Sequence, residues 1–260
     1  MPGPSDSYFS KTIEKGLAIL SLFDRNHPHI SLVAISRKLG INKTSTYRFV
    51  NTFVQLDYLQ KNPETKQLRL GPRALMMGYN FFQGFELLHS VKPLIDQIFK
   101  KERITIDSAL FDGEALLALY RRESADTIFF RQPPRNKDLH ARAMGKAVLS
   151  EFSREKILNF IKTIGLKRHT DKTIVNEESL LIELDASRIR GYSLNNEEFI
   201  PGLIAIGAPL KNFQLDKVVG AVSFDFSTNN YSIDMIQNEY ADAIKKLAND
   251  ISEIVTTADY

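Results

Sequence analysis

Residues 31–55 read SLVAISRKLGINKTSTYRFVNTFVQ and contain two short helical patterns separated by a glycine. Ser31 is a typical N-cap for the first helix, and Gly40 is a typical residue at its C-terminal end. Asn42 can cap the second helix, which the spacing of apolar residues predicts over residues 43–55. A short helix, a tight turn and a second capped helix indicate a helix-turn-helix unit.

The second of these helices has one apolar and one polar side when its residues are placed 100° apart. The apolar side is suited to a core and consists of Thr46, Phe49, Val50, Phe53 and Val54. The polar side has few carboxylates to repel phosphate, and it includes Thr44, Arg48, Asn51 and Gln55. A merely solvated face is the alternative, and the neighbouring elements decide against it. We predict a recognition helix whose DNA contacts are Lys43, Thr44, Ser45, Tyr47, Arg48 and Asn51.

Two short strands are predicted after this helix, over residues 58–61 and 67–70, with a turn-rich loop between them. Such a hairpin would form a wing beside the DNA backbone, with Lys61 and Lys66, and also Arg69, near phosphates. The alternative is that these cations only keep the hairpin soluble. An amphipathic helix is predicted ahead of the unit, over 11–23, with a core-facing stripe made of Ile13, Leu17, Leu20 and Phe23. We therefore expect a disordered tail over 1–8 and a winged helix-turn-helix domain over 9–71.

Charge is distributed unevenly along the chain, although the net charge is only +3. Residues 1–73 contain eleven Lys and Arg against five Asp and Glu, whereas the remainder contains twenty-three against twenty-six. A basic small domain thus precedes a mildly acidic larger one. Binding to the phosphate backbone requires such a basic domain, and ordinary scatter of surface charge is the alternative.

The composition of the 260 residues is that of a soluble globular protein with two domains, 43% hydrophobic and 25% charged. The absence of cysteine excludes disulfides, thiolate metal sites and cysteine nucleophiles. No apolar run is long enough to span a membrane, and the first residues lack the pattern of a signal peptide. We expect a cytoplasmic protein that does not associate with a membrane.

A linker helix is predicted over residues 72–88, because Pro72 suits the first position of a helix. Its apolar face includes Ala74, Leu75, Met77, Phe81, Phe82 and Phe85. This face needs a partner, which could be a second copy of the chain or the chain's own second domain. The second domain is expected over 89–260. Helices are predicted over 90–103, 143–152, 154–164, 177–190 and 233–255. Strands are predicted in blocks between these helices, over 105–111, 115–120, 127–131, 192–195, 203–210 and 218–226. This order indicates an α+β domain with a mostly antiparallel sheet.

Two stretches of the second domain resemble the signatures of the IclR family of transcriptional regulators: HARAMGKAVL at 140–149 and GYSLNNEEFIPG at 191–202. Residues 42–48 and the hairpin at 58–71 resemble the same family's DNA-binding domain. The resemblance implies a winged helix joined by a linker helix to a GAF-like effector-binding domain. It also implies dimers or dimers of dimers that bind double-stranded operator DNA, with a small organic or aromatic acid as effector.

The family's effector pocket can be carried over to this chain by position. The matching residues are Phe129, Arg131, Arg142, Ala143, Met144, Asn195, Leu203, Ala205, Ser223 and Asp225. Backbone N–H groups at the start of the helix near Ala143 can hold a carboxylate, and Arg142 could add a bidentate contact. Ser223 and Asp225 alternate along a strand and so share one side.

Three of these positions depart from the family's pattern. Asn195 replaces a commonly acidic residue, Asp225 stands where a small hydroxyl residue is often found, and Arg142 where Ser or Thr is usual. The departures suggest an effector with a hydrogen-bond donor near Asp225 as well as a carboxylate. The alternatives are that Asp225 ends its strand in solvent and that Arg142 is a surface ion-pair partner.

A second domain that is an enzyme for a small molecule, with an accessory DNA-binding module, is the alternative function. No motif predicts a cofactor or a metal site, and the five histidines at 27, 29, 89, 140 and 169 lack metal-ligand spacing. No nucleophile elbow, phosphate-binding loop or dinucleotide fingerprint occurs. A ligand-independent nucleoid protein would not need the large second domain. We therefore predict a regulator and no enzyme, with the linker helix connecting effector binding to operator affinity.

Overall fold

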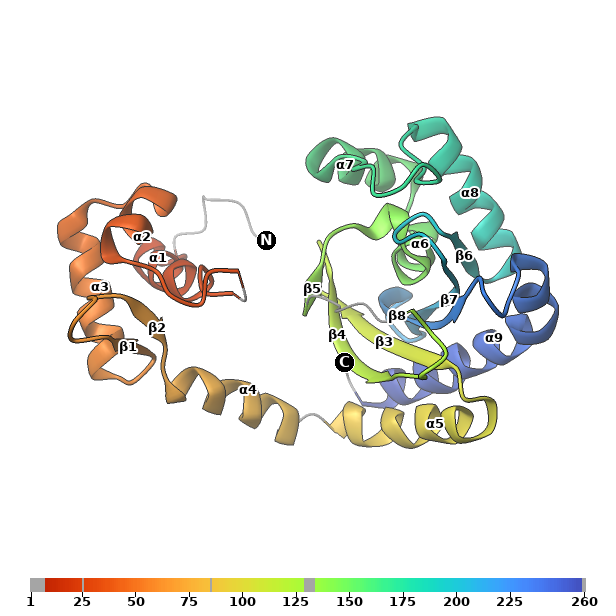
Figure 1. Cartoon of the computed structure of the whole chain (residues 1–260), viewed down its shortest axis with the longest axis horizontal. Coiled ribbons are helices and arrows are strands. Elements are labelled where there is room, and N and C mark those ends of the chain that lie inside the picture. The colour runs from red at the N-terminus through yellow and green to blue at the C-terminus, as the bar shows by residue number, and fades with distance from the viewer. Residues whose placement is uncertain (1–7, 25, 85, 129–133, 259–260) are drawn as a thin grey trace. The chain divides into compact units, whose positions relative to one another are not determined.

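The computed structural model describes residues 8–24, 26–84, 86–128 and 134–258, and only the backbone at 81–84 and 86. The predicted disordered tail and the predicted effector residues Phe129 and Arg131 lie outside the described residues, apart from Tyr8. The chain divides into two compact units, Met1–Phe85 and Glu86–Tyr260 (Figure 1). None of the described helices is long and apolar enough to cross a membrane.

The first unit is a winged helix-turn-helix. Its elements are α1 (Lys11–Leu20), α2 (Leu32–Leu39), α3 (Lys43–Gln55), β1 (Leu59–Lys61), β2 (Leu68–Leu70) and α4 (Pro72–Gly84). β1 and β2 pair antiparallel, and Ile30 adds one bridge to Leu68. The core joins all of these elements except α4, and its buried residues are Ile19, Phe23, Ile30, Ile35, Val50, Leu59 and Leu68.

The predicted helix boundaries around the turn are confirmed. Ser31 Oγ accepts a hydrogen bond from the N–H of Ala34 at 3.2 Å, and Asn42 Oδ1 accepts one from the N–H of Ser45 at 2.8 Å. Gly40 ends α2 with a φ of 63°, a left-handed conformation that favours glycine. These caps fix the angle at which α3 leaves the turn.

The prediction for the first helix is partly wrong. α1 ends at Leu20, and its residues Ile13 and Leu17 are 63% and 55% exposed, whereas Ile19 is fully buried. The buried face instead includes Gly16, which lies against Phe49 and Phe53 of α3. The side of α1 with Ile13 and Leu17 and the side with Ile19 are both apolar, so periodicity alone cannot show which one is buried. The small Gly16 allows the rings of α3 to pack on the side of α1 where it lies.

The second unit is a six-stranded antiparallel sheet with helices on both faces. Its elements are α5 (Glu86–Glu102), β3 (Thr105–Phe111), β4 (Leu116–Arg122), β5 (Arg135–Asn136), the 3-10 helix η1 (Leu139–Ala141), α6 (Ala143–Ser150), α7 (Arg154–Ile164), α8 (Glu177–Arg190), β6 (Ser193–Asn196), β7 (Leu203–Asn212), β8 (Lys217–Ser227) and α9 (Ile233–Thr257). The strand order is β5-β4-β3-β8-β7-β6. The predicted α+β fold class is therefore confirmed.

The two faces of this sheet differ in chemistry. Phe224 and Phe226 of β8 face α9, where their rings lie 6.2 and 4.9 Å from that of Tyr240. Ser223 and Asp225 alternate with them and so point to the opposite face, which α6 covers. Figure 1 shows α5 and α9 together along the apolar side of the sheet. The side covered by α6 carries the polar residues.

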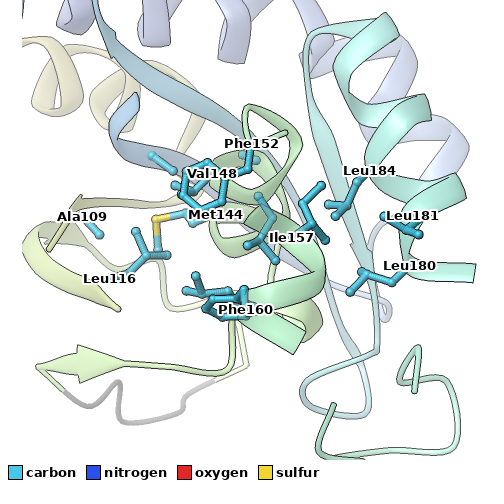
Figure 2. Close-up of a cluster of buried hydrophobic side chains, with 14 residues drawn as sticks. Ala109, Leu116, Met144, Val148, Phe152, Ile157, Phe160, Leu180, Leu181 and Leu184 are labelled. Carbon is cyan, nitrogen blue, oxygen red and sulfur yellow. The ribbon is translucent and has the colours of Figure 1, made fainter. Parts of the chain in front are cut away.

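A second apolar cluster packs around α6 and includes residues of α7 and α8 (Figure 2). Met144 and Val148 lie among Ile157 and Phe160 of α7, with Leu180, Leu181 and Leu184 of α8 at its far side. The side chain of Met144 points toward Leu116 of β4. α6 is thus held between a hydrophobic cluster and the polar face of the sheet, which leaves its first turn at that face.

The predicted strand over 127–131 is wrong where it can be checked, because Thr127 and Ile128 are not in a strand. The Thr127 side chain instead forms a hydrogen bond with Thr105 Oγ1 at 2.8 Å. The edge strand next to β4 is β5, whose Asn136 pairs with Leu116. The prediction missed β5 because it has only two residues and directly follows two prolines.

Candidate DNA interface and effector site

α3 presents the side chains predicted to contact DNA. Lys43, Thr44, Tyr47, Arg48 and Gln55 are exposed, while Ser45 and Asn51 are half-buried. Thr46 and Val50 on the opposite side are buried. The helix contains no carboxylate, so its outward face does not repel phosphate.

The β1–β2 hairpin carries the predicted wing cations on its surface. Asn62 Oδ1 accepts hydrogen bonds from the N–H groups of Glu64 and Thr65 and holds the turn. Lys66 Nζ contacts the carbonyl oxygen of Pro63 at 2.5 Å, and Arg69 Nε contacts Gln60 Oε1 at 3.0 Å. These contacts are exposed and can exchange for phosphate contacts at small cost. Lys61 is exposed at the end of β1.

The second site is the polar face of the large sheet beneath α6. One row of register partners across four strands is Asn195, Ala205, Asp225 and Thr105. The next row is Ser193, Gly207, Ser223, Asp107 and Arg121. Neighbouring strands are about 5 Å apart, so these rows form one continuous patch. We call these nine residues, together with Arg142, the polar patch.

α6 approaches the polar patch closely because Gly207 has no side chain. A Cβ atom at Gly207 would lie 2.9 Å from the carbonyl carbon of Ala143. Ser193 Oγ donates a hydrogen bond to the carbonyl oxygen of Ala143 at 2.6 Å. Arg142 occupies the N-cap position but makes no side-chain cap, so the first N–H groups of α6 lack the hydrogen bond that an N-cap side chain usually accepts. The helix therefore begins at the patch, with the end that attracts anions.

Four charged side chains meet in the polar patch. Arg121 Nη1 binds Asp107 Oδ2 and lies 3.7 Å from Asp225 Oδ2, while Ser223 Oγ donates to Asp225 Oδ1 at 3.0 Å. Arg142 is 6% exposed, and its guanidinium carbon lies 3.6 Å from the centre of the Phe199 ring. Burial lowers the pKa of Arg142 to about 10, while Asp225, Asp138 and Asp107 oppose that shift, so it remains a cation at neutral pH.

Asp107 and Asp225 are both buried, with 4% and 5% of their surface exposed. Burial raises the pKa of Asp107 well above its ordinary value, and the Asp225 carboxylate raises it further, against the lowering effect of Arg121. The alternatives of a solvent-exposed Asp225 and a surface Arg142 are therefore wrong.

Asn195 is held in a fixed orientation. Its Oδ1 accepts a hydrogen bond from the N–H of Glu198 at 2.8 Å, and Glu198 Oε1 in turn accepts one from Lys146 Nζ at 2.6 Å. Lys146 lies in α6 and is 1% exposed. This buried pair ties α6 to the segment after β6.

The predicted effector residues occupy different parts of this region. Asn195, Ala205, Ser223, Asp225 and Arg142 lie in the polar patch, with Ala143 directly above it. Leu203 is one step further along β7 and pairs with Ser227. Met144 directs its side chain into the hydrophobic cluster, so only its backbone can serve the patch.

The sequence reasoning missed Asp107 and Arg121, and with them Thr105 and Ser193. A signal was present in β3, because Thr105 and Asp107 alternate within a strand whose other residues are almost all apolar. A polar residue in a fully buried strand requires partners. Arg121 is its partner on the adjacent strand, directly opposite Asp107.

His140, the one histidine near the patch in sequence, has a structural role. It is buried, its Nε2 lies 2.9 Å from the carbonyl oxygen of Lys167, and burial lowers its pKa. No group of three or more His, Cys, Asp or Glu residues suited to a metal ion occurs in the part of the chain that the structure describes.

Comparison with known proteins assigns both units. The model of the bacterial transcriptional regulator IclR C-terminal domain matches residues 80–253, and that of the IclR helix-turn-helix domain matches residues 12–63. The chain is 27% identical over 251 residues to the HTH-type transcriptional regulator BhcR of Paracoccus denitrificans, covering 96% of this chain and 89% of BhcR. It is 26% identical over 249 residues to the p-hydroxybenzoate hydroxylase transcriptional activator of Acinetobacter baylyi, covering 94% and 91%.

A solved structure shares the fold. The IclR homolog of Microbacterium hydrocarbonoxydans, complexed with 4-hydroxybenzoate, has a TM-score of 0.75 at 18% identity, covering 95% of this chain and 99% of that one. The relatives are regulators by name, so the comparisons give the enzyme alternative no support. With both family domains matched in order along one chain, this protein is a DNA-binding transcriptional regulator that belongs to the IclR family.

Proposed function

We propose that this regulator binds a specific operator through α3 and the wing, and that a small organic acid bound at the polar patch changes its operator affinity. The observation that carries the second part is that Arg142 and the first turn of α6, which the Arg142 side chain does not cap, meet at one buried patch. A guanidinium and a helix N-terminus are both groups that bind carboxylates.

The DNA contacts that we propose follow from exposure and chemistry. Thr44, Arg48 and Asn51 can reach base edges, whereas Lys43, Ser45 and Tyr47 are placed for phosphates near the start of α3. Lys61 and Lys66 would contact the backbone beside the wing. Such a protein acts where the genome is, so we expect it in the cytoplasm.

We propose that the working form is a dimer or a dimer of dimers. The apolar face of α4 is exposed in the chain, with Leu75 76%, Met77 56% and Tyr79 55% accessible. Ile13 and Leu17 of α1 are exposed as well. A second copy can cover these side chains, and a dimer would place two α3 helices in successive major grooves. A pseudo-palindromic operator with half-sites about one helical turn apart, or a multiple of it, is expected.

The test is an anisotropy titration on labelled DNA from upstream of the protein's own gene, with unlabelled competitor DNA present. The titration is repeated with pyruvate, benzoate and 4-hydroxybenzoate. We expect saturable binding that resists the competitor and that at least one acid shifts. If that DNA is not bound, a genome-wide binding screen should find the operator, and a screen without any enriched sequence would contradict the proposal.

A further inference from the structure

The polar patch contains a pair of buried carboxyl groups that share one arginine. Asp107 of β3 and Asp225 of β8 lie on neighbouring strands, where Asp107 is opposite Ser223 and Asp225 is opposite Thr105. Both point to the α6 side, one ladder step apart. The Nη1 atom of Arg121 binds Asp107 and lies 3.7 Å from Asp225, so the two carboxyls flank one nitrogen.

The groups that face this pair come from several elements. Arg121 is on β4, where its Nη2 is also bound by Glu123 at 3.1 Å, so its charge is shared among three carboxylates. Arg142 lies directly before α6, and the charge of Asp138 also favours its cationic form. Ser223 donates a hydrogen bond to Asp225, whereas the hydroxyl of Thr105 donates to Thr127 Oγ1.

Two buried carboxyls that flank one arginine nitrogen repel each other when both are ionised, and little water is present to screen that repulsion. Loss of the second proton would leave two negative charges on either side of one arginine nitrogen, and their repulsion opposes that loss. A proton held between the two oxygens instead turns the repulsion into a hydrogen bond. Burial and the charge of Asp225 both raise the pKa of Asp107, consistent with this arrangement.

We propose that Asp107 and Asp225 form an acid pair that keeps one proton above the pH at which an ordinary aspartate loses it, and that this proton is linked to effector binding. The link rests on the proposed function, in which the effector is an anion bound at the same patch. A negative charge brought beside the pair raises its pKa, so an acid effector binds together with a proton. Asp107 is thereby a specificity residue of the effector site.

The linkage has a definite sign. Affinity for an anionic effector should fall as the pH rises through the pKa of the pair in the free protein, by at most about tenfold per pH unit for one linked proton. A cationic effector would show the opposite trend, because it would favour the ionised pair. The pH dependence therefore reports the charge of the natural effector as well as the state of the pair.

The first experiment needs no effector. Aspartate labelled with ¹³C at Cγ is incorporated into the full-length protein, and carboxyl shifts are followed against pH. We expect one resonance to titrate well above the ordinary aspartate range, and to disappear or return to that range in Asp107→Asn and in Asp225→Asn. Asp242→Asn, a change at a fully exposed residue of α9, is the matched control and should leave that transition unchanged. Titration of every aspartate in its ordinary range would overturn the proposal.

The second experiment measures the link by calorimetry with 4-hydroxybenzoate, in buffers with different ionisation enthalpies at one pH. We expect proton uptake of up to about one per protomer, reduced in Asp107→Asn. Proton release on binding would overturn the link. If neither 4-hydroxybenzoate nor the other acids bind while the NMR transition is intact, the acid pair is supported and the proposed acid effector is contradicted. The two failures are therefore distinguishable.

Discussion

At the scale of single residues, the most specific prediction about DNA binding concerns Arg48. It is exposed on the face of α3 that carries no carboxylate, and an arginine there can contact guanine through two hydrogen bonds. Arg48→Ala should weaken binding to the operator by about 1–3 kcal/mol and relax the preference for one base. Arg154→Ala, a change at an exposed arginine of α7, is the matched control. An equal loss on random DNA would demote Arg48 to a phosphate contact.

A second prediction concerns Asp107 and the pH dependence of the free energy of unfolding. Because its pKa is raised in the folded protein, the native state holds a proton that the unfolded chain has already released. The stabilising contribution is present at low pH and is lost as the pH rises from the ordinary aspartate range toward the raised pKa. The free energy of unfolding, measured with urea across this range, should therefore fall more steeply in the native protein than in Asp107→Asn. Parallel pH profiles would contradict the raised pKa.

At the scale of elements, the contact between α6 and β7 depends on a position without a side chain. Gly207→Ala would place a Cβ atom 2.9 Å from the backbone of Ala143, so α6 must shift. We expect a loss of about 1–3 kcal/mol in stability, with weaker effector binding in the same variant. Gly78→Ala in α4, where no atom lies within 4 Å of a new Cβ, is the control and should not destabilise. A Gly207→Ala variant with unchanged melting temperature and effector affinity would refute the close approach.

The elements also show what local sequence can and cannot predict. α3, α7 and α8 have the predicted boundaries, because Asn42, Ser153 and Asn176 cap them and their side chains bond the expected N–H groups. The alternation of Ser223 and Asp225 correctly placed both on one side of a strand. α1 was misread because two of its stripes are apolar.

The polar patch could be predicted only in part. Asp107 and Ser223 lie 116 positions apart and meet through the pairing of β3 with β8, which no local pattern specifies. The family resemblance named positions on β7 and β8 but not the partners on β3 and β4. The departures at Arg142 and Asp225 become understandable only with Arg121 and Asp107 beside them, since Arg121 lies near Asp225 and the neighbouring carboxylates favour the charged form of Arg142.

At the scale of the whole molecule, regulation requires two sites and a link between them. The exposed apolar face of α4 is the expected place for a second copy. Leu75→Glu should shift the protein toward monomer in sedimentation velocity and weaken operator binding, because a charge in an apolar interface is costly to bury. Asn80→Glu, on an exposed polar residue of the same helix, is the control. Unchanged sedimentation of Leu75→Glu would move the dimer interface elsewhere.

An effector can change operator affinity only if it binds two arrangements of the protein with different affinity, and the coupling must be reciprocal. The measurement that tests this most directly is the dissociation constant for operator DNA with and without a saturating acid, together with that acid's own constant with and without DNA. The account predicts that both change by the same factor, typically about 5–150-fold. Binding of both ligands with neither affected by the other would contradict it.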